Sequence, residues 1–276
     1  MILVTGASGT VGSALLAELR ALGAPARPAY RDPARAGDGA VVLDLADPAG
    51  FPAALEGVDA MFLLAPTNPA QTALELSAVA AARAAGVRVV KLSVWRADEG
   101  LTPIARLHRP AEEALAASGL RWTLLRPNFY LQNFLRQPTI RTEGVFSLPR
   151  IEAPISFADT GDIARVAARV LTTDGHDGRV YDITGPEALT YAEAADRFSA
   201  VLGKPVRYLG PPDEEARAAM LARGLPEFQA DALIEVARAY RHGGAERVTP
   251  VVGELTGRPA TTFEEFVRAN RAVFSP

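Results

Sequence analysis

The sequence predicts an α/β protein built on a doubly wound, mostly parallel sheet. Through the first 127 residues, short apolar runs alternate with longer alanine- and leucine-rich segments whose apolar residues recur at the helical period. The short runs are continuously apolar, as expected for strands that helices cover on both faces. A glycine-rich turn follows the first run. The predicted strands are 2–5, 40–43, 60–64, 87–90 and 121–125, and a further strand fits 26–30, although Pro28 inside it has no N–H to donate.

Beyond Pro127 the pattern changes, because proline and glycine recur and break the regular alternation of strand and helix. This change predicts a smaller C-terminal α+β lobe packed on the sheet. We therefore expect a sheet domain over 1–127, to which segments near 155–184 return, and a lobe over 128–276 that mostly binds substrate. Helices are predicted at 159–173, 191–202, 213–223, 226–240 and 263–273.

The composition excludes several classes of site. The chain has 276 residues, a formal net charge of −3 and no cysteine, so disulfides, zinc–thiolate sites and a cysteine nucleophile are excluded. The three histidines, His108, His176 and His242, lie far apart, and no metal site is predicted. The absence of a basic cluster argues against a nucleic-acid partner. No apolar stretch reaches the ~20 residues that span a bilayer, and no basic leader precedes the first strand, so we expect a cytoplasmic protein with no membrane partner. A homodimer stays open.

The first predicted strand leads directly into a glycine-rich turn, Gly6-Ala-Ser-Gly9-Thr-Val-Gly12, which opens a segment of helical period. Glycine at these three positions allows a sharp turn, close approach of backbone N–H groups to a pyrophosphate, and tight packing of helix on strand. Structural turns also use glycine, but the strand–turn–helix context favours dinucleotide binding at the helix N-terminus. The predicted contacts are Gly6, Ser8, Gly9, Thr10, Val11 and Gly12.

The residues after the second strand predict which nicotinamide cofactor binds. An acidic side chain there accepts a hydrogen bond from the ribose 2′-hydroxyl of NAD, whereas an arginine pairs with the 2′-phosphate of NADP. Arg31 and then Arg35 follow the strand, which favours NADP(H). Asp32 as the ribose acceptor and Arg31 as a solvated surface residue stay open as alternatives. Further cofactor contacts are expected at Asp44 and Leu45, beside the adenine, and at Ala65, Pro66 and Thr67, beside the adenosine and ribose.

One catalytic pattern is missing. Short-chain dehydrogenases that reduce carbonyls carry Tyr-x-x-x-Lys on one helix, a spacing that places the phenol and the ammonium on one face so that the lysine lowers the tyrosine pKa. None of the six tyrosines here has a lysine four residues later. His108 and Glu112 occupy the corresponding positions. This counts against sugar epimerases and ordinary alcohol dehydrogenases.

The chain resembles the NmrA-like family of atypical short-chain dehydrogenases/reductases over essentially its full length. The matching stretches are 6–12, 30–33, 90–93, 108–112, 117–133, 157–164 and 181–187. The resemblance implies a Rossmann domain that carries NADP(H) and a smaller C-terminal lobe that closes a cleft over the nicotinamide. The family contains quinone, azo and dye reductases as well as non-enzymatic redox sensors, so membership leaves the activity open.

Three side chains are candidates for catalysis. Ser93 follows the fifth strand, where an open α/β sheet binds its ligands, and its hydroxyl is a candidate donor to an acceptor oxygen and a candidate cofactor contact. The alternative is a serine that satisfies backbone groups at the strand end. Tyr130 is the second candidate donor. His108 is a candidate proton shuttle, with a structural or surface histidine beside Glu112 as the alternative.

The segment after the sixth strand is expected to face the nicotinamide, with Pro127, Asn128 and Phe129 as cofactor contacts. An aromatic wall for a flat substrate is predicted from Trp95, Phe129, Tyr130 and Phe134, although aromatic residues at helical spacing also form cores. Hydride transfer to an acceptor that is already electron-poor dispenses with a Tyr–Lys pair, because the acceptor needs only positioning and a hydrogen-bond donor.

Two functional hypotheses follow. The first is an NADPH-dependent reductase that transfers hydride to an aromatic quinone, ketone or related electron-poor acceptor. The second is a non-catalytic redox sensor that binds NADP(H) and acts through a protein partner, which the missing acid–base pair motivates equally.

Replacing Arg31 with alanine tests the cofactor prediction. If Arg31 pairs with the 2′-phosphate, Arg31→Ala weakens NADPH binding much more than NADH binding. Equilibrium titration of both cofactors against both proteins measures the effect. Equal weakening of the two cofactors would show that Arg31 does not touch the 2′-phosphate.

Overall fold

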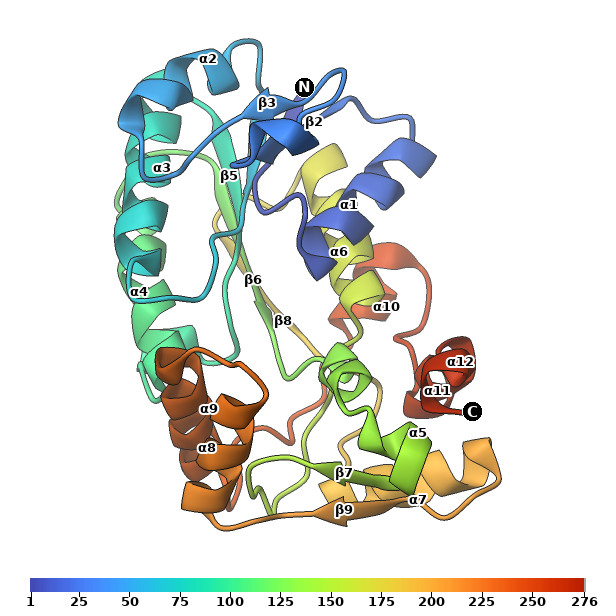
Figure 1. The fold of residues 1–276 in the computed structure, drawn as a ribbon. Helices are drawn as coiled ribbons and strands as arrows, with labels where there is room; N and C mark the ends of the chain where they lie inside the picture. The colour runs from blue at the N-terminus through green and yellow to red at the C-terminus, as the bar shows by residue number, and fades with distance from the viewer. Residues whose placement is uncertain (276) are drawn as a thin grey trace.

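A computed structural model describes residues 1–275 and contains a seven-stranded parallel sheet in the order β3-β2-β1-β4-β5-β6-β8 (Figure 1). This arrangement confirms the predicted doubly wound α/β fold, with the strand order reversing beside β1. The strand at the Pro28 position pairs with β1 and β3 on either side. The strands are β1 (Ile2–Val4), β2 (Ala26–Tyr30), β3 (Val41–Val42), β4 (Ala60–Leu63), β5 (Arg88–Leu92), β6 (Trp122–Pro127) and β8 (Arg179–Ile183).

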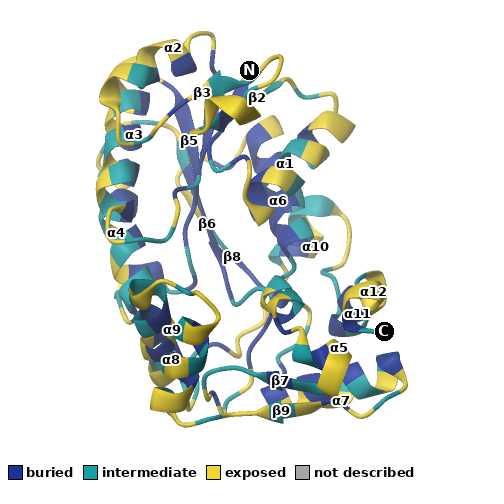
Figure 2. Cartoon of the chain, viewed as in Figure 1, coloured by how far each residue is buried: buried dark blue, intermediate teal, exposed yellow. Residues whose placement is uncertain are grey.

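Helices cover both faces of the sheet, and Figure 2 shows the central strands buried between them. Successive residues of a strand point to opposite faces, so each central strand feeds two cores. Val4 and Phe62 pack in a core with α1 and α6, whereas their neighbours Leu3 and Met61 pack in a core with α2 and α3. The covering helices are α1 (Thr10–Ala21), α6 (Thr160–Thr172) and α10 (Val251–Thr256) on one face and α2 (Phe51–Leu55), α3 (Gln71–Ala85) and α4 (Pro103–Ala116) on the other.

The C-terminal lobe lies below the sheet in Figure 1. It has its own aromatic core. Phe134 lies at its centre, with edge-on contacts to Phe146, Phe198 and Phe263 at ring-centroid distances of 5.3, 5.4 and 5.3 Å. The lobe is built from η4 (Leu131–Arg136), α5 (Thr139–Glu143), β7 (Val145–Ser147), α7 (Tyr191–Leu202), β9 (Arg207–Leu209), α8 (Asp213–Ala222), α9 (Glu227–Tyr240), α11 (Phe263–Ala269) and α12 (Arg271–Phe274).

The predicted helices are present, with one correction. The expected continuous helix over 263–273 is divided into α11 and α12, because Asn270 leaves the helical conformation and its Nδ2 donates to the carbonyl of Phe266 at 2.8 Å. Short 3₁₀ turns, η1 (Pro33–Arg35), η2 (Pro48–Gly50) and η3 (Ala97–Glu99), complete the described chain. None of the helices formed by residues 1–275 is long and apolar enough to cross a membrane.

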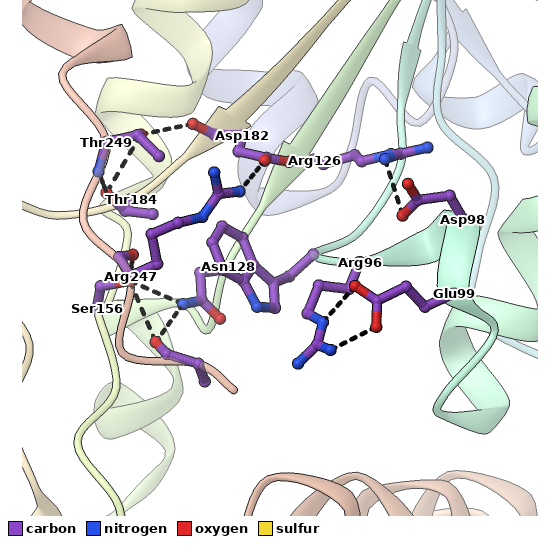
Figure 3. Close-up of polar contacts among 12 residues, drawn as sticks. Arg96, Asp98, Glu99, Arg126, Asn128, Ser156, Asp182, Thr184, Arg247 and Thr249 are labelled. Atoms are coloured by element: carbon purple, nitrogen blue, oxygen red, sulfur yellow. Dashed lines mark hydrogen bonds and ion pairs between the residues drawn. The ribbon is translucent and has the colours of Figure 1, made fainter. Parts of the chain in front are cut away.

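Asn128 fastens the end of β6 to two distant segments (Figure 3). Its side-chain Nδ2 donates to Ser156 Oγ and to the carbonyl of Ala245, both at 2.8 Å, and its backbone N–H donates to the carbonyl of Ile183 at 2.9 Å. The residue is only 2% exposed, so water does not replace these bonds when they are lost. Asn128 therefore holds the lobe against the carboxyl end of the sheet.

We expect Asn128→Ala to lower the free energy of unfolding by about 1–3 kcal/mol, because Ser156 and Ala245 lose a buried partner. Urea denaturation of wild type and variant measures the change. Asn133→Ala is the matched control, since Asn133 is exposed and its side chain makes no hydrogen bond to residues 1–275. Equal unfolding midpoints for Asn128→Ala and the control would contradict this role.

Candidate functional site

The glycine turn has the shape that a pyrophosphate needs. Gly6 has φ of 63°, and a Cβ on Gly12 would lie 2.1 Å from the carbonyl oxygen of Gly6, so only glycine fits there. Helix α1 begins at Thr10 with no acidic residue in its first turn, and no side chain among residues 1–275 caps it. The first N–H groups of α1 are therefore oriented to donate to an anion, and the turn fits a dinucleotide phosphate.

Thr5 connects the glycine turn to the end of β4, the neighbouring strand in the sheet. Its Oγ1 accepts from the backbone N–H of Leu64 at 2.8 Å, and it lies 3.1 Å from the carbonyl oxygen of Phe62. These contacts join the ends of β1 and β4. The segment Ala65-Pro66-Thr67, predicted to line the adenosine and ribose, consequently follows directly beside the glycine turn.

The end of β2 presents two exposed arginines. Arg31 and Arg35 are exposed and make no ion pair with any residue of 1–275. Asp32 is engaged locally, since its Oδ1 accepts from the backbone N–H of Ala34 at 3.0 Å and caps η1. Asp44 is engaged in the same way, with the N–H of Ala46 at 2.9 Å. The local bond of Asp32 favours Arg31 over Asp32 as the group that meets the ribose 2′ position. Leu45 is half-buried against the α2–α3 core.

Two adjoining cavities lie where the sheet domain meets the lobe. One has a volume of about 330 Å³ and the other about 420 Å³. Their walls share seven residues: Phe129, Tyr130, Asn133, Arg136, Leu225, Leu233 and Val236. The larger cavity extends to Thr67 and Val94 after β4 and β5, and the smaller extends under Phe134 and Met220 into the lobe. The cavities thus connect the predicted cofactor edge with the predicted substrate lobe.

The structure brings most of the predicted cleft residues to these walls. Thr67, Trp95, Pro127, Asn128, Phe129 and Tyr130 line the larger cavity, and Phe134 lines the smaller. Trp95 and Phe134 are 5% and 1% exposed, so each is a core residue with one edge on a cavity. The indole of Trp95 is held in place because its Nε1 donates to the carbonyl of Gly244 at 2.8 Å and the Arg247 guanidinium lies 4.9 Å above its ring.

Tyr130 lines both cavities, and its hydroxyl makes no hydrogen bond to residues 1–275. Burial raises the pKa of Tyr130 well above the ordinary value of 10.0. The phenol therefore stays protonated at any working pH. Tyr130 is suited to donate a hydrogen bond to a ligand oxygen, and it is not suited to ionise.

Ser93 lies outside both cavity walls. Its side chain is 1% exposed, and its Oγ has no hydrogen-bond partner within the described chain. Side chains alternate along β5 and its extension, so Ser93 points to the same face as Lys91, toward α3 and α4. The alternative of a serine that satisfies backbone groups is not observed. This orientation does not place the hydroxyl on either cavity wall, and the catalytic role and the cofactor contact of Ser93 stay predictions.

His108 is buried in a polar cluster between β5, α3 and α4. Lys91 Nζ donates to His108 Nδ1 at 2.8 Å and to Glu75 Oε1 at 2.7 Å, while Gln71 lies against the same ring. Burial and then the Lys91 charge lower the pKa of His108, so the imidazole stays neutral. His108 is 4% exposed and lines neither cavity, which favours the structural alternative; its proton-shuttle role stays a prediction.

Glu112 does not pair with His108. Its Oε1 instead accepts from Arg126 Nε at 3.0 Å, and Arg126 also bonds Asp98 at 2.9 Å across the end of the sheet (Figure 3). The side-chain pairing suggested by the spacing of four residues is therefore replaced by a contact between α4 and β6. Two carboxylates balance the charge of the Arg126 guanidinium. These ion pairs stabilise the end of β6 beneath the cavity.

Sequence reasoning missed Tyr240 and Arg136. Tyr240 ends α9, is 3% exposed and lines the larger cavity. Its hydroxyl is buried and has no hydrogen-bond partner within residues 1–275. Its ring meets Phe129 edge-on at 5.8 Å, and burial raises its pKa to about 12. Arg136 ends η4 and lines both cavities. In sequence, both residues belong to ordinary amphipathic or loop segments, and no local signal distinguishes them.

Comparison with known proteins identifies the family to which the chain belongs. A model of the NmrA-like family matches residues 1–267. The chain belongs to the NmrA-like family. This confirms the resemblance inferred from the motifs.

Three relatives of this NmrA-like protein share nearly its whole length. It is 40% identical to the (4-alkanoyl-5-oxo-2,5-dihydrofuran-3-yl)methyl phosphate reductase of Streptomyces griseus, with 100% of both chains covered. It is 38% identical to the NAD(P)H azoreductase of Xenophilus azovorans, with 99% of each covered. A crystal structure of the Escherichia coli NADPH-dependent quinone oxidoreductase QOR2 with NADPH is 31% identical, with a TM-score of 0.88 over 98% of this chain and 100% of that one.

The buried histidine gives a prediction for acid stability. Because the pKa of His108 is lowered from its ordinary 6.5, the unfolded chain binds a proton in that range that the folded chain does not. The free energy of unfolding therefore falls as the pH decreases below 6.5, and His108→Gln removes that contribution. Urea denaturation at a series of pH values between about 7 and 5 measures it.

If His108→Gln and wild type lose stability in parallel as the pH falls, His108 is not held neutral and the assignment fails.

Proposed function

We propose that this protein is an NADPH-dependent reductase that transfers hydride to an electron-poor aromatic acceptor, a quinone, ketone or azo compound. The observation that carries the proposal is the continuity of the larger cavity, whose wall runs from Thr67 beside the predicted cofactor edge to Tyr130 and Tyr240. Relatives of full length named as reductases, and a structural neighbour complexed with NADPH, support the oxidoreductase assignment and the cofactor.

The cofactor side of the site fits a phosphorylated dinucleotide. The glycine turn and the first turn of α1 offer backbone N–H groups to the pyrophosphate, and Arg31 and Arg35 offer guanidinium groups to a 2′-phosphate. Bound NADPH would supply a hydride from its nicotinamide ring. Val94, Pro127 and Asn128 form the adjoining wall, where they limit the positions open to a planar acceptor.

The chain's contribution to the reaction is positioning and hydrogen bonding. As hydride reaches an electron-poor acceptor, negative charge develops on its oxygen or nitrogen. Tyr130 and Tyr240 both line the larger cavity, and neither hydroxyl has a protein partner within the described residues. We therefore assign these two hydroxyls as the donors to that atom. Their raised pKa values keep both phenols in the donating form, so water supplies the final proton. The apolar walls hold the acceptor ring and exclude competing water.

The proposal predicts a separation of stability from activity at Tyr240. Tyr240→Phe removes a buried hydroxyl that has no partner, so the free energy of unfolding stays equal or rises, while kcat falls about 10- to 100-fold. NADPH oxidation with a panel of quinones, azo dyes and aromatic ketones, with NADH alongside, measures activity. Tyr181→Phe is the control, because Tyr181 lies on β8, its hydroxyl bonds His176, and it lines neither cavity.

Turnover of panel members, faster with NADPH than with NADH and reduced in Tyr240→Phe alone, would support the reductase. Tight NADPH binding with no oxidation above buffer by any acceptor would contradict it and would favour the redox-sensor alternative.

A further inference from the structure

The charged residues on the walls of the two cavities are all positive. The residues that line the two cavities include Arg136, which lies on both, and Arg223, which lies on the smaller. No aspartate or glutamate lines either cavity within the part of the chain that the structure describes. The rest of the lining is aromatic, aliphatic or neutral polar. Two positive charges therefore stand on walls that otherwise carry no charge.

Neither cation is neutralised by the protein. Arg136 makes no side-chain hydrogen bond or ion pair with residues 1–275, and Arg223 makes a single one, from its Nε to the carbonyl of Ala219 in its own helix at 3.0 Å. One arginine on α8 and one on α9 behave differently. Arg217 pairs with Asp231 at 2.5 Å, and Arg238 pairs with Asp213 at 2.7 Å. Unlike Arg217 and Arg238, the two arginines on the cavity walls make no ion pair within residues 1–275.

An unpaired guanidinium on an apolar wall favours an anionic ligand. Arg136 and Arg223 are exposed to solvent as well as lining a cavity. The planar fork of the guanidinium matches carboxylate, sulfonate and phosphate oxygens. The two cations come from different elements, Arg136 from η4 and Arg223 from the end of α8, so a single acidic group or two separated ones can be met from two directions. The tyrosine hydroxyls and the aromatic walls are then available to contact the planar part of the ligand.

We propose that the acceptor carries an acidic group, a carboxylate, sulfonate or phosphate, and that Arg136 and Arg223 bind it while the aromatic ring lies against Phe129, Tyr130 and Tyr240. This inference rests on the proposed reductase function and specifies the substrate class of the same site. Arg136 and Arg223 are then specificity-determining residues that touch the ligand but not its reacting atoms.

The test uses acceptors that differ only in charge. A 2-anilino-1,4-naphthoquinone with a para-carboxylate on the aniline ring is compared with the matching para-carboxamide, which keeps the shape and removes the charge. KM and kcat are measured with NADPH for wild type, the Arg136→Gln/Arg223→Gln double variant, and Arg141→Gln. Arg141 is the matched control. It lies on α5, close to Arg136 in the sequence, is exposed, and lines neither cavity. The ratio of the two KM values in each protein cancels the intrinsic reactivity of the two quinones.

For wild type and Arg141→Gln, we expect the KM of the carboxylate to be about tenfold below that of the carboxamide, and the preference to shrink at high ionic strength. The double variant loses most of that preference through the KM of the carboxylate, with kcat and the Kd of NADPH changed little. The para-sulfonate and para-phosphate members then show which acid binds best. Equal preference in the double variant and wild type, or no preference in wild type, would overturn the inference and leave the reductase function intact.

If no acceptor is reduced, the proposed function fails and the inference is tested separately by binding. Trp95 lines the larger cavity, so quenching of its fluorescence in the NADP⁺ complex gives Kd values for the carboxylate and the carboxamide. A carboxylate preference that the double variant lacks would still support the anion site. Equal Kd values for the two quinones would contradict it. Arg136→Glu is a second variant, expected to reverse the preference toward the neutral quinone.

Discussion

The fold depends on burial of both faces of the central strands. In β1, β4, β5 and β6, one residue packs into the α1–α6 core and the next into the α2–α3 core, so each strand needs a helical layer on either side. Helical crossovers that satisfy this requirement make the strands parallel. All of their carboxyl ends therefore meet at one edge, where the glycine turn, Thr67, Val94 and the segment after Pro127 come together. Thr5 and Asn128 hold that edge in register with its neighbours.

The elements that could be predicted from the sequence are those that a local residue pattern encodes. Continuous apolar runs identified the central strands, and three glycines identified a turn whose Gly12 has no room for a side chain. Strand β8 was not predicted, because its exposed Arg179 and Val180 break the apolar run. The cavity was predicted only from the ends of β4, β5 and β6. Its other wall comes from α9, and an amphipathic helix carries no local mark of the partner it will face. Lys91 was likewise missed as a buried charge, since its compensation by Glu75 comes from a distant helix.

The chemistry of the site follows from where the charges lie. The buried ammonium of Lys91 is bonded to Glu75 and His108 on the α3–α4 side, away from the cavities, so it does not lower the pKa of a cavity tyrosine. Burial raises the pKa values of Tyr130 and Tyr240, so both phenols stay protonated. In the reaction that we propose, such a site suits an acceptor that takes hydride without a strong acid, and Arg136 and Arg223 would select among such acceptors by charge.

A crystal structure of the protein with NADP⁺ and the carboxylated anilinonaphthoquinone tests the central claim most directly, which is that cofactor and acceptor meet in the larger cavity. We predict the nicotinamide beside Val94 and Asn128, and a quinone oxygen that accepts a hydrogen bond from Tyr130 or Tyr240. A quinone bound away from the nicotinamide, or one whose oxygens touch neither tyrosine, would contradict the account.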